Sequence, residues 1–284
     1  MSLINNTLYS DDRKNAIRVS NIQKIETEIP FSGFAAKLVL TGMEKYFIGD
    51  KKFEVSAGEY ILGNSQTFAS IAINDPQGVQ GLCVDISDEI ISEVASFHFE
   101  NDSDFKKYLF SEKFLVNKYR QQNTVLGYAL TELVDFIGSS DALHTSFKEE
   151  LFYSLAEAMM TDQTTIYRGL SNLKFKKNST NHITFLKLEE CREYILENYL
   201  QSIDIEKLAI LSGMSKYHFI RTFKTTYNIT PYQLIIQERL HFAKDLLLKK
   251  TPIIHVAQTI GFSDIASFSK AYKNYFGYSP SKEN

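Results

Sequence analysis

The sequence predicts a protein of the α+β class, with an amino-terminal antiparallel β domain plus helices and an all-helical carboxy-terminal domain. Three observations predict it. Residues 31–86 form short strand-like runs, whereas residues 186–276 repeat apolar side chains at helical spacing. Charge divides as well: residues 1–169 carry 15 Lys+Arg against 24 Asp+Glu, a net of −9, and residues 170–284 carry 16 against 10, a net of +6. The whole-chain net charge of −3 therefore averages two different domains.

The β domain is predicted from six runs of strand-forming residues bounded by Gly, Asp, Asn or Pro. The runs are FAAKLVLTG, EKYFIGD, KKFEVSAG, EYILGN, QTFASIAIND and VQGLCVDIS. Strands at intervals of about ten residues, with no helical pattern between them, favour an antiparallel barrel or sandwich. Gly49-Asp50 predicts a tight hairpin turn between the second and third runs.

Helices are predicted after these runs. Ser87, Asp88 and Glu89 supply a cap for a helix through IISEVASFHF. Two further amphipathic helices are predicted at roughly 123–138 and 145–160, because their apolar residues recur at spacings of three and four. Two roles stay open for this pair: it completes the core of the β domain, or it forms a dimer surface.

A polar stretch separates the two domains. Residues 170–184 are rich in Asn, Ser, Thr and Lys and lack a sustained period, which is typical of a linker. The predicted organisation is a β-rich domain over residues 1–169 with helices at about 87–160, a linker over 170–184, and a helical domain over 185–284. A length of 284 residues agrees with about two domains.

One pattern occurs twice in the helical domain, at residues 203–231 and 251–280. Each copy has a short helix with a Leu-Ala or Val-Ala pair, a Gly-apolar-Ser turn, and a longer helix with two aromatic residues four positions apart. The turns are Gly213-Met214-Ser215 and Gly261-Phe262-Ser263, and the aromatic pairs are Phe219/Phe223 and Phe268/Tyr272. This order is typical of a helix-turn-helix unit, whose second helix enters the major groove of DNA.

The first recognition helix is amphipathic in a way that suits DNA. Phe219, Phe223 and Tyr227 recur every four residues and are expected to face the core. The opposite face combines a guanidinium, amines, a hydroxyl and an apolar group. We expect Arg221 to contact guanine or phosphate, and Ile220 to pack on a thymine methyl group. The residues predicted to contact DNA from this helix are Lys216, Tyr217, His218, Ile220, Arg221 and Lys224.

The second recognition helix presents fewer base-reading groups. Phe268, Tyr272 and either Tyr275 or Phe276 are expected to face inward. The residues predicted to contact DNA are Ile265, Ala266, Ser267, Ser269, Lys270 and Lys273, with both lysines directed mainly to phosphates. An uninterrupted helix over 231–249 is expected to space the two recognition helices about one turn of DNA apart, roughly 34 Å.

Short motifs in the helical domain appear in the order of a known family. They are Pro231-Tyr232-Gln233, Arg239 followed by Ala243 and Leu246-Leu247, Gly261-Phe262, and Gly277-Tyr278-Ser279-Pro280. Through them, residues 186–281 resemble the DNA-binding domain of the AraC/XylS family of bacterial transcription regulators. The resemblance implies DNA contacts at Tyr217, Ile220, Arg221, Ile265, Ala266, Ser267, Ser269 and Lys270.

The chain departs from the family pattern at Asn228, where the family commonly has Gly at the end of the first recognition helix. Asn tolerates the left-handed backbone conformation, so we expect this helix end to be kept. In the amino-terminal half, the order of strands and helices is similar to the cupin-like β barrel and dimerisation helices of family members. This implies a regulatory or dimerisation role for residues 1–169, with no effector-binding residue identified.

Other classes of protein find little support. None of the six histidines, at 98, 144, 182, 218, 241 and 255, lies in the strand runs, so neither a metal site nor another cofactor is expected. No catalytic residues are predicted, because phosphate loops and nucleophile motifs are absent. Cys83 and Cys191 are isolated, which favours small buried residues in a reducing, cytoplasmic setting. No apolar run approaches the roughly 20 residues of a membrane span.

The resulting interpretation is a DNA-binding transcription regulator that reads two adjacent major-groove segments and is not an enzyme. Its expected partner is double-stranded DNA. A small-molecule effector, a second copy of the chain, and RNA polymerase in the case of an activator are further candidates, and a membrane is not. The alternatives are a ligand-sensing or protein-binding adaptor with weak DNA binding, and a cupin-type enzyme.

Overall fold

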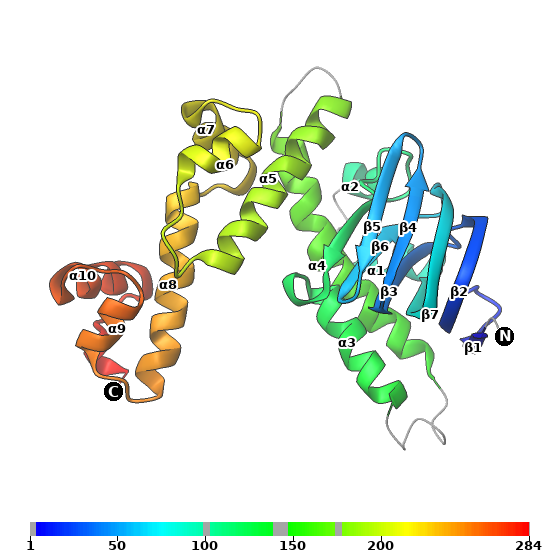
Figure 1. The fold of residues 1–284 in the computed structure, drawn as a ribbon, viewed down its shortest axis with the longest axis horizontal. Coiled ribbons are helices and arrows are strands. Elements are labelled where there is room, and N and C mark those ends of the chain that lie inside the picture. Colours follow the sequence, from blue (N-terminus) through cyan, green and yellow to red (C-terminus); the bar gives the residue numbers. More distant parts are fainter. Residues whose placement is uncertain (1–3, 99–102, 139–146, 174–177, 284) are drawn as a thin grey trace. The chain divides into compact units, whose positions relative to one another are not determined.

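The structure is a computed structural model, and it describes residues 4–98, 103–138, 147–173 and 178–283. The chain divides into two compact units, Met1–Tyr167 and Arg168–Asn284, which we call the amino-terminal and carboxy-terminal units. Figure 1 shows strands and helices in the first and helices in the second. The predicted α+β class, with an antiparallel sheet followed by a helical domain, is confirmed.

The amino-terminal unit is built on one eight-stranded sheet whose paired strands are antiparallel. The strands follow the order β1-β2-β7-β3-β6-β8, while β4 pairs with β7 and β5 pairs with β4. Their bounds are β1 (Ile4–Ser10), β2 (Ala16–Pro30), β3 (Phe34–Thr41), β4 (Met43–Ile48), β5 (Lys51–Ser56), β6 (Glu59–Gly63), β7 (Phe68–Ile86) and β8 (Asn117–Arg120). The predicted hairpin turn is confirmed, because Ile48 pairs with Lys51 across Gly49-Asp50 and Gly49 has φ of 55°.

Strand β7 is the centre of the sheet. Residues 68–74 and 79–85 of β7 pair with β2, residues 70–72 also pair with β4, and residues 80–86 also pair with β3. The last two predicted runs are thus one strand, although Pro76 and Gly78 lie within it. The register accounts for this: Ile22 pairs with Val79 and Lys24 with Asn74, so residues 75–78 bulge from the ladder and need no partner.

The strands outside residues 31–86 are not predicted from the sequence. β1 and β2 precede this range, and β8 lies inside the region predicted to be helical, where it pairs with β6. The physical reason is that apolar and polar residues alternate only weakly along β2. Most of its residues are partly or fully exposed, so the strand needs no regular apolar face. β8 is only four residues long and carries no periodic signal of its own.

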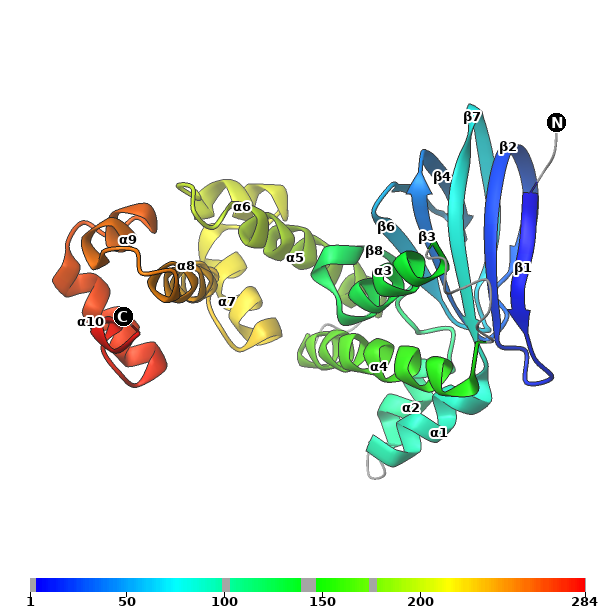
Figure 2. The same cartoon turned by 90° about the horizontal axis from the view of Figure 1, so that it is seen from below.

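Helices cover one face of this sheet, as Figure 2 shows. They are α1 (Asp88–His98), α2 (Ser103–Leu109), α3 (Val125–Gly138) and α4 (Glu149–Asn172). The predicted cap of α1 is confirmed, since Ser87 Oγ accepts a hydrogen bond from the Ile90 amide at 3.2 Å. At the start of α3 the Asp162 carboxylate accepts from the amides of Val125 and Leu126 at 3.0 and 2.9 Å.

The apolar faces of α3 and α4 are buried within the amino-terminal unit. Leu126, Leu130 and Leu133 of α3 and Leu155 and Met159 of α4 are at most 4% exposed. Of the two roles left open by the sequence, completion of the core is therefore observed. On the outer side of α3, Tyr128 is 62% exposed.

The carboxy-terminal unit is helical. Its elements are α5 (Asn178–Asn198), α6 (Ile205–Leu211), α7 (Lys216–Tyr227), α8 (Pro231–Leu248), α9 (Ile253–Thr259), α10 (Ile265–Phe276) and the short 3-10 helix η3 (Pro280–Lys282). The first repeat copy, 203–231, contains α6 and α7, the predicted helix 231–249 corresponds to α8, and the second copy, 251–280, contains α9 and α10. Within the described residues, no helix combines the length and apolar character required to cross a bilayer.

The segment 170–184 differs from the predicted linker. Helix α4 continues to Asn172 and α5 begins at Asn178, while residues 174–177 lie outside the described part of the chain. Burial explains the helical ends: Leu170 and Leu173 are 8% and 4% exposed, and Thr184 is also buried. Tertiary packing therefore overrides a local sequence that is polar and without period.

Candidate nucleic-acid interface

The first helix-turn-helix unit consists of α6 and α7. The Asp204 carboxylate caps α6 through the Glu206 amide at 2.9 Å, and Ser215 Oγ caps α7 through the His218 amide at 3.4 Å. Between the helices Gly213 has φ of 71°, a conformation that disfavours other residues. Phe219 and Phe223 are fully buried, with ring centroids 5.7 Å apart, so the phase predicted for α7 is confirmed.

Helix α7 ends as expected from Asn228. This residue takes the left-handed conformation, with φ of 61°, and its amide donates to the Lys224 carbonyl at 2.8 Å. The chain then enters α8 through a capping box: the Thr230 hydroxyl accepts from the Gln233 amide, and the Gln233 side chain accepts from the Thr230 amide. These two features end α7 and start α8 within three residues.

The outer side of α7 holds the six predicted residues, which we call the α7 face. Lys216, Tyr217, His218, Arg221 and Lys224 are exposed, and Tyr217 is exposed by 76%. Ile220, which the sequence places on this face, is partly buried. Five of the six predicted residues are therefore accessible to a partner, and Ile220 is accessible in part.

The second helix-turn-helix unit consists of α9 and α10, and its turn is one residue longer than the turn of the first. Gly261 has φ of 82° and matches Gly213, but α10 begins after Asp264 rather than after Ser263. The Asp264 carboxylate accepts from both the amide and the hydroxyl of Ser267, at 2.7 and 2.8 Å. These hydrogen bonds lower the pKa of Asp264. The extra residue explains why the aromatic pair lies one position further from the glycine than in the first unit.

The predicted inward side of α10 is also confirmed. Phe268 and Tyr272 are fully buried against Leu240, Ala243 and Leu247 of α8. Of the two aromatic residues left open, Phe276 packs against this core, whereas Tyr275 is 40% exposed and its hydroxyl lies 2.9 Å from His241 Nε2.

The outer side of α10 holds the other six predicted residues, which we call the α10 face. Ile265, Ala266, Ser267, Lys270 and Lys273 are exposed, and Ser269 is partly buried. The Ser267 hydroxyl donates to Asp264, so it is not free to read a base edge without giving up that bond. The α10 face is thus more apolar at its first turn and cationic toward its end.

The cations of the two faces differ in whether they have partners. Lys216 forms an ion pair with Glu206 at 3.3 Å. Within the part of the chain that the structure describes, no carboxylate pairs with Arg221, Lys224, Lys270 or Lys273. Unneutralised cations on an exposed face are the groups that displace counterions from a polyanion.

Helix α8 connects the two helix-turn-helix units of the carboxy-terminal unit. Its 18 residues make it about 27 Å long at 1.5 Å per residue. Figure 1 shows α6 and α7 near its start and α9 and α10 near its end. Arg239, midway along α8, donates to the carbonyls of Tyr199 and Gln201 at 2.6 and 2.8 Å and so ties α8 to the segment after α5.

The same guanidinium explains the glycine of the second turn. A Cβ at Gly261 would lie 2.9 Å from Arg239 Nη1, in a backbone conformation that already favours glycine. Arg239 and Gly261 therefore have a packing role, because they bring the turn between α9 and α10 against the middle of α8.

A polar network around Glu189 is not predicted from the sequence, in which Glu189 resembles an ordinary exposed carboxylate. Its side chain is 15% exposed, pairs with Arg192 at 3.0 Å and accepts from the Tyr227 hydroxyl at 2.5 Å. Burial and the Glu189 charge raise the pKa of Tyr227 well above its usual value. The network ties α5 to the last turn of α7, so it positions the α7 face.

The described residues contain no cluster of three or more His, Cys, Asp or Glu side chains arranged to hold a metal ion. Cys191 is buried, and its thiol donates to the Leu208 carbonyl at 3.5 Å, in agreement with a structural role. Cys83 is instead partly exposed, so the prediction of a buried apolar role is wrong for this residue.

Comparisons with known proteins match residues of the carboxy-terminal unit. Residues 208–283 match the family model of a helix-turn-helix domain. The probable transcriptional regulator LumQ of Photobacterium leiognathi is 31% identical over 102 residues, covering 34% of this chain and 41% of that protein. The virulence regulon transcriptional activator VirF of Yersinia enterocolitica is 36% identical over 95 residues, covering 33% of this chain and 35% of that protein.

Among solved structures, the chain is similar to a probable AraC family transcriptional regulator from Rhodopseudomonas palustris. The identity is 30% and the TM-score 0.33, with 34% of this chain and 93% of that chain covered. The chain matches less than half the length of the two curated relatives above. Both of those relatives are named as regulators of transcription.

Proposed function

The chain belongs, through its carboxy-terminal unit, to the AraC/XylS family of transcription regulators, and from this we propose that it binds DNA sequence-specifically and regulates transcription. The observation that carries the proposal is the pair of exposed faces on α7 and α10. Each belongs to a helix-turn-helix unit with a closed aromatic core, and together they present four cations without carboxylate partners among the described residues.

The two faces have different tasks in this proposal. The α7 face reads bases: the Arg221 guanidinium matches guanine O6 and N7, and the exposed Tyr217 adds a hydroxyl and a ring. The α10 face contributes phosphate contacts through Lys270 and Lys273, while Ile265 and Ala266 offer apolar contact to thymine methyl groups. Helix α8, as a continuous spacer, sets the two faces on adjacent major-groove segments.

The amino-terminal unit takes the regulatory part. Residues 1–169 carry a net charge of −9, so they are repelled by DNA and suited to meeting a ligand or a second copy of the chain. In this proposal residues 1–169 form the regulatory or dimerisation domain and residues 185–284 the DNA-binding domain. DNA as partner and two free cysteines agree with a cytoplasmic setting. For an activator, RNA polymerase is the further partner.

Replacement of Lys270 by alanine tests the phosphate role. Because Lys270 is exposed and has no carboxylate partner among the described residues, its ammonium is available to release a counterion from DNA. We expect weaker binding to all sequences alike, and a salt dependence whose slope, in log affinity against log salt, is smaller by about one. Titration of labelled DNA at several salt concentrations measures both quantities.

The matched control is Lys51→Ala, which removes the same charge from an exposed position in the amino-terminal unit. It should leave affinity and salt slope as they are in the unaltered chain. An unchanged slope in Lys270→Ala, or a loss confined to one DNA sequence, would contradict the phosphate assignment.

A further inference from the structure

The carboxy-terminal unit repeats one three-helix arrangement, first as α5-α6-α7 and then as α8-α9-α10, which we call the first and second repeats (Figure 1). Three buried residues recur at identical spacing in the two long helices: Leu188, Cys191 and Ile195 in α5, and Leu240, Ala243 and Leu247 in α8. The turns match as well. The Met214 amide donates to the Ala209 carbonyl at 2.9 Å in the first repeat. The Phe262 amide donates to the Ala257 carbonyl at 2.9 Å in the second.

A cation from the long helix covers the glycine of each turn. In the second repeat this cation is Arg239, whose Nη1 lies 2.9 Å from the position that a Cβ of Gly261 would take. In the first repeat the residue at the equivalent position of α5 is Lys187. Its Nζ lies 3.2 Å from the position that a Cβ of Gly213 would take. Lys187 and Arg239 are therefore equivalent residues in equivalent places.

The two cations differ in what holds them. Arg239 donates to the carbonyls of Tyr199 and Gln201 at 2.6 and 2.8 Å, so its guanidinium fastens α8 to the segment after α5. Lys187 is partly exposed. Within the part of the chain that the structure describes, its ammonium has neither a hydrogen-bond acceptor nor a carboxylate partner. The repeat thus provides a cation at both turns, and the structure of the protein uses only the second.

The turn beside Lys187 is where a helix-turn-helix unit meets the DNA backbone. The recognition helix enters the major groove by its first turn, while the preceding helix crosses the backbone, so the connection between them lies at the edge of the groove. Contacts at that edge go to phosphates. Lys216, at the start of α7, is already paired with Glu206 at 3.3 Å. Lys187 therefore brings to this edge a positive charge that no carboxylate of the described residues neutralises.

We propose that Lys187 contacts a DNA phosphate at the edge of the major groove read by α7, as a phosphate anchor that belongs to neither recognition helix. The proposal rests on the proposed DNA binding and adds to it a residue of α5. The two repeats then use one position in two ways: Arg239 fastens the second repeat to the first, and Lys187 fastens the first repeat to DNA. A lysine suits this task, because its ammonium is a compact charge on a flexible stem.

Replacement of Lys187 by methionine tests the anchor, because it keeps a long flexible side chain and removes the charge. Binding to the selected site and to unrelated DNA should weaken alike, about threefold to tenfold, and the slope of log affinity against log salt should be smaller by about one. Lys187→Arg should retain binding, since Arg239 shows that a guanidinium fits beside the equivalent turn. The control Lys51→Met, on the exposed hairpin of the amino-terminal unit, should change neither quantity.

Ethylation of single phosphates in the selected site locates the anchor on the DNA. An ethylated phosphate has lost its charge, so ethylation at a contacted position weakens binding. For the unaltered chain, one such phosphate should lie at the edge of the block of base pairs whose selection depends on Arg221. In Lys187→Met, ethylation of that phosphate should no longer matter, whereas ethylation at the other contacted phosphates should still weaken binding. A loss of packing alone would not remove the effect of one phosphate.

Acetylation of lysine amines gives a second readout that needs no variant. The reaction is followed residue by residue by mass spectrometry on the full chain, with and without the selected DNA. DNA at ten times its dissociation constant should slow acetylation of Lys187 and of Lys270 about tenfold and leave Lys51 unaffected. This measurement holds even if Lys187→Met fails to fold.

An unchanged salt slope in a folded Lys187→Met, an unchanged ethylation pattern, or an unprotected Lys187 at saturating DNA would each overturn the proposal. Protection of Lys270 without protection of Lys187 would overturn the anchor alone and leave the DNA-binding function in place. Absence of binding to any DNA would contradict the proposed function itself, and the anchor with it. The two failures are therefore distinguishable.

Discussion

Replacing Arg221 by alanine is expected to weaken binding to the selected DNA site by about 1–3 kcal/mol, roughly fivefold to more than a hundredfold, and to relax selectivity at one base pair. The reason is geometric. Arg221 is exposed on α7, and no carboxylate among the described residues competes for its guanidinium. Parallel titrations of the preferred site and of sites altered at single base pairs measure the loss and its sequence dependence.

Arg221→Lys is the matched variant, because it keeps the charge and removes the planar pair of donors. If Arg221 reads guanine, this variant should lose selectivity almost as fully as Arg221→Ala while keeping most of its affinity for unrelated DNA. Normal selectivity in either variant would place the reading face elsewhere on the unit.

Phe223→Ala is expected to lower the free energy of unfolding of the carboxy-terminal unit by about 3–5 kcal/mol. Phe223 is fully buried and lies between two aromatic rings, with centroids 5.7 Å away at Phe219 and 4.6 Å away at Tyr227. Its removal leaves a cavity at the centre of α7. Hydrogen exchange read by mass spectrometry on the full chain reports the opening free energy of each unit separately.

Tyr217→Ala on the same helix is the control. Its side chain is 76% exposed, so the free energy of unfolding should change by less than about 0.5 kcal/mol while DNA binding weakens. The two variants thus separate the packing side of α7 from its reading side. A loss of stability below about 1 kcal/mol in Phe223→Ala would mean that this ring is not central to the unit.

The helices of the carboxy-terminal unit were predictable because local chemistry marks their ends. Ser215 and Asp204 cap helices through their side chains, and Asn228 and Gly277 end them in the left-handed conformation. The aromatic spacing of Phe219 and Phe223 gave the phase of α7, and the structure agrees with it. The twelve residues predicted to contact DNA follow from that phase and lie on the outer sides of α7 and α10, two of them partly buried.

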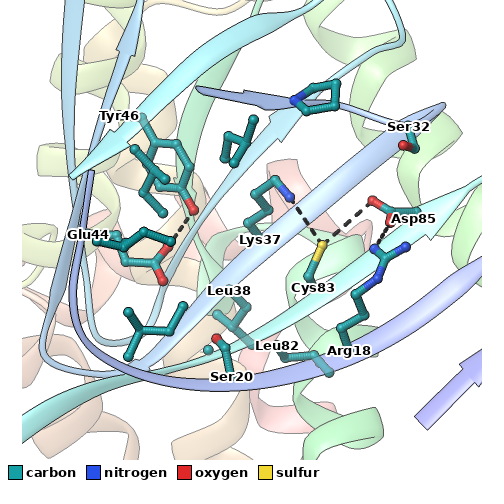
Figure 3. A pocket seen from close by; sticks show the side chains of 16 residues that line it. Arg18, Ser20, Ser32, Lys37, Leu38, Glu44, Tyr46, Leu82, Cys83 and Asp85 are labelled. Carbon is teal, nitrogen blue, oxygen red and sulfur yellow. Dashed lines mark hydrogen bonds and ion pairs between the residues drawn. The ribbon is translucent and has the colours of Figure 1, made fainter. Parts of the chain in front are cut away.

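What could not be predicted depends on partners distant in the sequence. Strand β2 is stabilised by β7 rather than by its own apolar pattern, and the ends of the expected linker are helical because Leu170 and Leu173 are buried. Glu189 reads as a surface carboxylate until Tyr227 is placed beside it. Figure 3 shows a cavity of about 310 Å³ in the amino-terminal unit, in whose lining Arg18, Cys83 and Lys37 lie in one row. That row exists only in the register of three strands, so no spacing along the chain reveals it.

The central claim is that the two helix-turn-helix units read one DNA site together. Selection of bound DNA from a random pool by the full chain, followed by a footprint on the selected site, tests it most directly. The account predicts two blocks of selected and protected base pairs, with centres about 10 base pairs apart on one side of the duplex. Arg221→Ala should erase selection in one block only. A pool that stays random, or a single selected block unaffected by Arg221→Ala, would contradict the account.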